Sequence, residues 1–213
     1  MSNTDNHLST LCSRYPALTG LRDNIAEAAE MIISCYNQGG KLLVCGNGGS
    51  CADAEHLTAE LMKSFEKERP LDQSLIDRLC EISPERGRFL GEKLSHALPA
   101  IPLTSNTALT TAVSNDTDSS LIFAQQLIGY GNEGDILIGL STSGNSVNVI
   151  DACITARALN MNIIGFTGSS GGKMKQFCDI LINVPETRTA WVQELLLPAM
   201  HTVCLIVEDF FYS

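Results

Sequence analysis

Four short, almost wholly apolar runs recur along the chain, each separated from the next by a stretch long enough for a helix. They are KLLVC (41–45), DILIGL (135–140), NIIGFTG (162–168) and DILINV (179–184), and PAIPL (99–103) is a weaker fifth. A strand without polar alternation is buried on both faces, as in a parallel sheet covered by helices. Helical spacing of apolar residues predicts helices over 24–38, 51–65, 107–113, 121–128, 147–159 and 189–211. The sequence therefore predicts an α/β fold, a three-layer αβα sandwich.

Residues 66–98 interrupt this alternation. The segment is rich in charge, is punctuated by Pro70 and Pro84, and is typical of two short amphipathic helices. We expect one domain over residues 1–213, in which 66–98 is a helical insert that acts as a lid or as a subunit contact.

Charge and cysteine usage exclude several classes of protein. The net charge is −10 and no basic stripe occurs, so we expect no binding to nucleic acid. No unbroken run of about 18 apolar residues suggests a membrane span, and the first residues lack the pattern of a secretory signal. Eight cysteines lie in or near apolar runs without any CxxC pair, which favours free thiols and a cytoplasmic protein.

Two polar turns follow predicted strands, at the edge of the sheet where such folds bind ligands. GNGGS (46–50) begins a helix, but it matches neither the Walker A pattern nor GxGxxG. STSGNS (141–146) places the hydroxyls of Ser141, Thr142, Ser143 and Ser146 around one glycine. Capping a helix needs fewer hydroxyls than these, so this turn favours binding of a phosphate monoester.

Two pairs of polar residues occupy helical positions that share a face. His56 and Glu60 are four residues apart, and Gln193 and His201 are eight residues apart on the last predicted helix. Together they could hold a divalent metal such as zinc or perform acid–base chemistry, if the fold brings them together. Spacing alone does not establish that convergence, and each histidine could equally be an ordinary packed residue.

The order of these motifs identifies a resemblance. GNGGS, DAEHLTAEL, SND (114–116), STSGNS, TGSSGGKM (167–174) and the pair Gln193 and His201 follow one another as in the sugar isomerase (SIS) domain proteins, most similarly to the phosphoheptose isomerases. The resemblance spans nearly the whole chain except 66–98. It implies a five-stranded parallel sheet of the flavodoxin-like or Rossmann-like type, and a homotetramer with active sites at subunit interfaces.

The resemblance also implies residue roles. Glu60 would be the catalytic base and His201 the acid, and the positions that hold zinc in some members of the family correspond to His56, Glu60, Gln193 and His201. STSGNS would bind the sugar phosphate. The family usually has a basic residue shortly after the glutamate, and Lys63 stands beside that place. The other substrate-binding positions correspond to Asn47, Gly48, Ser50, Asp116 and Gln193.

The implied activity is isomerisation of sedoheptulose 7-phosphate to D-glycero-D-manno-heptose 7-phosphate through an enediol(ate), in heptose biosynthesis for surface polysaccharide. One alternative is a non-catalytic SIS protein that binds a sugar phosphate or the replication initiator. The passage FEKERP (65–70) resembles a passage found in such proteins. Such relatives tend to lack the residues found here as Glu60 and His201. Another alternative is an isomerase of a different phosphosugar.

Overall fold

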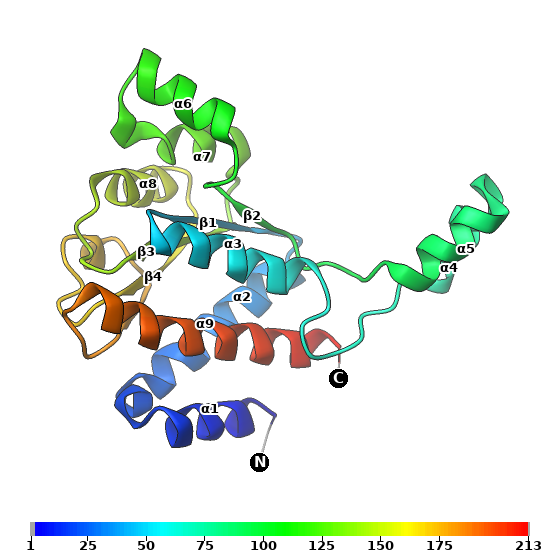
Figure 1. Ribbon diagram of the computed structural model, residues 1–213, viewed down its shortest axis with the longest axis horizontal. Helices are drawn as coiled ribbons and strands as arrows, with labels where there is room; N and C mark the ends of the chain where they lie inside the picture. Colours follow the sequence, from blue (N-terminus) through cyan, green and yellow to red (C-terminus); the bar gives the residue numbers. More distant parts are fainter. Residues whose placement is uncertain (1–2, 213) are drawn as a thin grey trace.

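A five-stranded, entirely parallel sheet lies at the centre of the computed structural model, which describes residues 3–212 (Figure 1). The strand order is β2-β1-β3-β4-β5, and the central strand β3 pairs with β1 and β4 over its length. The predicted fold class and strand number are therefore confirmed. The strands are β1 (Leu42–Gly46), β2 (Ala100–Pro102), β3 (Ile136–Ser141), β4 (Asn162–Thr167) and β5 (Ile180–Asn183).

Helices cover both faces of this sheet. Alternate strand residues point to opposite sides, so Val44 and Ile138 face the core beneath α2, α3 and α9, whereas Leu43 and Leu137 face α7 and α8. The α-helices are α1 (Asn3–Arg14), α2 (Arg22–Asn37), α3 (Gly49–Met62), α4 (Gln73–Ile82), α5 (Pro84–Lys93), α6 (Thr107–Asp116), α7 (Ala124–Tyr130), α8 (Val147–Ala158) and α9 (Thr189–Phe211), and the short 3-10 helices are η1 (Pro16–Leu21), η2 (Ser119–Leu121) and η3 (Met174–Gln176).

The long helix α9 crosses the sheet beside α2 and α3 (Figure 1). By length and composition alone it could cross a membrane, but half of its most apolar window is buried inside the structure. Leu196, Met200 and Val203 pack in the larger of the two cores, so α9 serves here as a core helix.

The helices of the insert, α4 and α5, form an arm that extends away from the sheet (Figure 1). They pack against each other and make no extensive contact with any other helix or strand of residues 3–212. Gly87 and Gly91 of α5 face α4 and permit this close approach, because a Cβ at either position would clash with α4. A bridge between Pro70 and Ser95 closes the base of the arm.

All eight cysteines are free thiols. Cys35, Cys45, Cys153 and Cys204 are buried, as apolar neighbours in sequence indicate, whereas the other four are only partly buried. Burial raises the pKa of the Cys35 thiol to about 11 and that of Cys45 to about 12. These two thiols are therefore uncharged at neutral pH and serve as packing groups.

Candidate active site

The carboxyl ends of β1 and β3 bring the two polar turns side by side. Asn47, in the first turn, and Asn148, in the first turn of α8, exchange two side-chain hydrogen bonds of 2.8 Å each. The reciprocal amide pair fixes the separation of the turns. The sequence does not indicate a role for Asn148, which belongs to no motif. Its partner Asn47 becomes apparent only when β1 is seen to pair with β3.

The turn at 141–146 is built as an open cradle and not as a helix cap. Ser146 precedes α8, but its side chain makes no capping bond; its Oγ lies 3.0 Å from the Oγ of Ser141. Ser143 Oγ accepts a hydrogen bond from the amide of Asn145 at 3.1 Å. The hydroxyls thus lie next to the free amides at the start of α8, where a helix favours an anion.

The glycine-rich segment 168–174 packs against this cradle and is hydrogen-bonded to it. Gly144 has a φ of +64°, and a Cβ there would collide with the backbone of Gly171. The amide of Met174 donates to the Gly144 carbonyl at 2.9 Å, and the amide of Lys173 donates to Asn145 Oδ1 at 3.0 Å. Only glycine fits where the turn at 141–146 meets the segment 168–174, which explains why both segments contain glycine at the contact.

The first turn, GNGGS, has a different character. Gly48 adopts a φ of +57° immediately before α3, and no side chain caps the helix. The side chain of Ser50 is buried, whereas Asn47 and Gly48 are exposed. Asp116 is exposed at the end of α6 and accepts a hydrogen bond from Asn115 Nδ2 at 2.8 Å.

Three of the predicted functional residues meet between α3 and α9. His56 Nε2 lies 3.2 Å from Glu60 Oε1 and 3.3 Å from His201 Nε2. The Glu60 side chain is 12% exposed, and its other oxygen accepts a hydrogen bond from Lys63 Nζ at 3.0 Å. Phe65 packs beside the His201 ring, with 5.5 Å between ring centroids. The cluster combines a carboxylate, two imidazoles and an ammonium group.

The surroundings of His201 keep its imidazole uncharged. Burial lowers the pKa of His201 below the ordinary value, and the neighbouring His56 lowers it further, while Glu60 acts in the opposite direction. At neutral pH the ring therefore has one lone pair and one N–H. Such a ring can bind a metal ion or exchange a proton with an oxygen atom.

Gln193 lies apart from this cluster. Its amide occupies the space in front of Gly49, where a Cβ would clash with it. α3 and α9 run in the same direction, since Gly49 meets Gln193 and His56 contacts His201. His56 is seven residues beyond Gly49, about 10 Å along the helix at 1.5 Å per residue. The structure thus brings together three of the four residues that the resemblance assigns to zinc.

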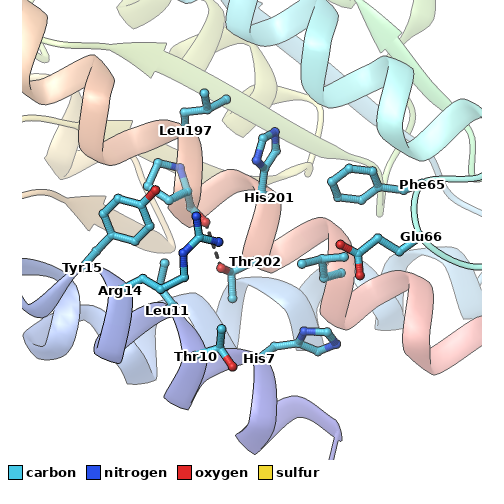
Figure 2. A pocket seen from close by; sticks show the side chains of 12 residues that line it. His7, Thr10, Leu11, Arg14, Tyr15, Phe65, Glu66, Leu197, His201 and Thr202 are labelled. Carbon is cyan, nitrogen blue, oxygen red and sulfur yellow. Dashed lines mark hydrogen bonds between the residues drawn. The ribbon is translucent and has the colours of Figure 1, made fainter.

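A cavity of about 310 Å³ adjoins His201 and reaches the N-terminal helix (Figure 2). His7 and Arg14 of α1 line it together with Phe65 and Glu66. The sequence did not indicate α1 as a contributor, because its residues match no motif.

The five-stranded parallel sheet agrees with the fold that the resemblance to SIS domain proteins implies, and comparison with known families supports the same assignment. The SIS domain family matches residues 13–84 and 86–168. The chain belongs to this family.

Within it, the chain belongs with the phosphoheptose isomerases. It is 42% identical over 185 residues to the phosphoheptose isomerase of Rhodospirillum rubrum, a match that covers 87% of this chain and 85% of the relative. The enzyme of Campylobacter jejuni is 39% identical, with 90% and 89% covered. The phosphoheptose isomerase structure from Francisella tularensis superposes with a TM-score of 0.74 at 35% identity, covering 98% of this chain and all of that one.

Proposed function

We propose that this chain is an aldose–ketose isomerase that converts sedoheptulose 7-phosphate to D-glycero-D-manno-heptose 7-phosphate. The observation that carries the proposal is the contact of Glu60 and His201 through His56, in a chain whose relatives are named phosphoheptose isomerases. Relatives that only bind a ligand have no need for a carboxylate and an imidazole held together in this way. The eight free cysteines support a cytoplasmic enzyme, since disulfides form in oxidising compartments.

The proposed chemistry follows from the groups present. The hydroxyls of STSGNS and the first amides of α8 bind the phosphate, so that remote binding energy holds the reacting carbons in place. Glu60 removes a proton from C1, which gives a cis-enediol(ate), and a proton returned to C2 completes the aldose. His201, uncharged at neutral pH, moves a proton between the oxygens on C1 and C2. Asn47, Gly48, Ser50, Asp116 and Gln193 are proposed to contact the sugar.

Geometry within one chain supports a site shared between subunits of a homotetramer. Glu60 lies eleven residues beyond Gly49, about 16 Å along α3 at 1.5 Å per residue. It faces α9, whereas Glu55 on the same helix bonds Thr104 beyond β2. The phosphate cradle adjoins the start of α3 through the Asn47–Asn148 pair, so it is separated from Glu60 of the same chain by most of the length of α3. A substrate in the cradle is best served by Glu60 and His201 of a neighbouring subunit.

We also propose that zinc binds the cluster through His56, Glu60 and His201. Two ligands at about 2.0–2.1 Å from a tetrahedral ion lie about 3.3–3.4 Å apart, and the two contacts of His56 measure 3.2 and 3.3 Å. Among the described residues no group of three or more His, Cys, Asp or Glu side chains is arranged to hold a metal ion as it stands, so zinc would require these side chains to rearrange. Gln193 would have to turn from Gly49 to add a fourth ligand. Bound zinc would polarise a substrate oxygen as a Lewis acid.

Zinc content should depend on the histidines of the cluster, His56 and His201, and not on His96. We expect protein dialysed against zinc to retain it in proportion to chain concentration, and His56→Ala to lose most of it, as measured by elemental analysis. His96→Ala is the matched control, because His96 pairs with Asp72 at the base of the arm. Equal zinc in the two variants would contradict the proposed ligand set.

The activity itself is tested with a panel of C5, C6 and C7 ketose phosphates followed by NMR. We expect sedoheptulose 7-phosphate to be converted with the largest kcat/KM, and solvent deuterium to enter at C2 of the product. Preference for a pentose or hexose phosphate would reassign the enzyme to another phosphosugar. Binding without conversion of any sugar would favour a non-catalytic SIS protein.

A further inference from the structure

A buried ion pair joins the helix α9 to the segment that follows α3. Arg69 Nε and Nη2 each lie 2.8 Å from Glu208 Oε1, and the two side chains are 0% and 1% exposed. Neither side chain takes part in the proposed proton transfers. A buried ion pair is often no more stabilising than apolar side chains of the same volume, so the stability of the fold does not by itself account for this one.

Arg69 binds the end of the helix that carries Glu60. α3 ends at Met62, and the carbonyl groups of the last turn of a helix have no partner within the helix. Arg69 Nη1 donates to the Leu61 carbonyl at 2.6 Å. Arg69 Nη2 donates to the carbonyl of Glu60 itself at 3.1 Å. The guanidinium group therefore holds the main chain from which the Glu60 carboxylate extends.

Glu208 makes the corresponding contacts on the side of His201. It lies seven residues beyond His201 on α9, which is about two helical turns, so both residues project from the same face. Its carboxylate accepts hydrogen bonds from the amides of Phe65, Glu66 and Lys67 at 2.9, 2.8 and 3.1 Å. The ring of Phe65 lies beside the imidazole of His201 (Figure 2). Glu208 therefore fixes the main chain of the residue that packs against His201.

We propose that Arg69 and Glu208 are positioning residues that set the placement of Glu60 relative to His201. The proposal rests on the proposed function, in which these two residues are the base and the acid. A displacement of about 1 Å between reacting groups can cost about 100-fold in rate. The planar guanidinium group holds its donors in a fixed geometry, so it can bind two carbonyls of α3 and a carboxylate of α9 at once. The pair acts through the two helices and through Phe65, and not on the substrate.

Two variants test this role. Arg69→Met/Glu208→Leu removes the fixed geometry and leaves no buried charge unpaired. Arg69→Lys keeps the charge, but one ammonium group cannot reproduce the fork that binds Glu208 and both carbonyls. We expect each to lower kcat for sedoheptulose 7-phosphate about 10- to 100-fold. The KM and the inhibition constant of inorganic phosphate should stay within about twofold of the wild type, because the proposed phosphate cradle adjoins the opposite end of α3. Circular dichroism verifies that each variant is folded at the assay temperature.

Leu127→Ala is the control for a general loss of stability. Leu127 is fully buried in the smaller core, on the face of the sheet opposite to α3 and α9, so its truncation weakens the fold and should leave kcat unchanged. Wild-type kcat in either folded variant of the pair, a loss that lies in KM alone, or an equal loss of kcat in Leu127→Ala would each overturn the positioning role.

A second measurement does not depend on turnover. If the wild type converts no ketose phosphate, the proposed isomerase fails, and NMR of isotope-labelled histidine rings then decides the positioning role. The ring signals of His56 and His201 should shift in Arg69→Met/Glu208→Leu and stay in place in Leu127→Ala. Unshifted signals in the double variant would show that the pair does not position the cluster.

Discussion

Glu60→Gln is expected to lower kcat/KM for sedoheptulose 7-phosphate by about 10²- to 10⁴-fold, the range of a lost general base. The amide keeps the shape and can still contact His56 and Lys63, but it cannot take a proton from carbon. His201→Ala should also remove most of the activity. Turnover is measured by NMR, and circular dichroism and light scattering verify the fold and the subunit number.

Glu92→Gln on α5 is the control, since it makes the same chemical change on an exposed helix distant from the cluster. Wild-type turnover in Glu60→Gln would remove Glu60 from the mechanism.

Complementation between two inactive variants tests whether each active site is shared between subunits. A variant with Ser143 and Ser146 both changed to alanine should be inactive alone, and co-expression with Glu60→Gln should restore activity in mixed tetramers. Failure of the mixture to regain activity would place each site within one chain.

Glu208→Gln is expected to cost about 3–5 kcal/mol of unfolding free energy, the usual penalty for breaking a buried ion pair. The Glu208 side chain is 1% exposed and accepts hydrogen bonds from the amides of Phe65, Glu66 and Lys67 and from Arg69 Nε at 2.8 Å. Urea denaturation measures the loss. The double variant Arg69→Met/Glu208→Leu should lose less than the single one, because it leaves no buried charge unpaired. A single variant as stable as the wild type would contradict this account.

The same carboxylate gives the stability a pH dependence. Burial by itself would raise the pKa of Glu208, but the amides of Glu66 and Phe65 and the Arg69 guanidinium outweigh it and hold the pKa below the ordinary value. A lowered folded-state pKa stabilises the protein above the unfolded pKa and ceases to do so as the pH falls through the folded one. The stability difference between wild type and Glu208→Gln should therefore shrink below about pH 4.

The sheet was predictable because burial on both faces leaves a local mark: runs such as DILIGL carry no polar alternation. The polar turns were predictable for the same reason, since each directly follows such a run. Contacts between distant segments leave no such mark. The sequence around Asn148 does not indicate its contact with Asn47, and the sequence around Arg69 does not indicate its ion pair with Glu208.

The long helix shows both outcomes. Its spacing put Gln193 and His201 near one face, which is true, but eight residues carry them about 12 Å apart along the axis at 1.5 Å per residue. A parallel neighbour then meets each at a different level, His201 at His56 and Gln193 at Gly49. Helical periodicity predicts on which side of a helix a residue lies. Two residues that bind the same ligand must also lie close together along the helix axis.

The arm formed by α4 and α5 has a consequence for how this chain can change over evolutionary time. Its two ends are already adjacent, since Pro70 and Ser95 pair at its base, and its helices depend on each other and not on the sheet. Such a hairpin can be gained, shortened or lost in one event without any compensating change in the cores. No residue of α4 or α5 belongs to either core, so a change in the length of the arm leaves the packing of the sheet intact.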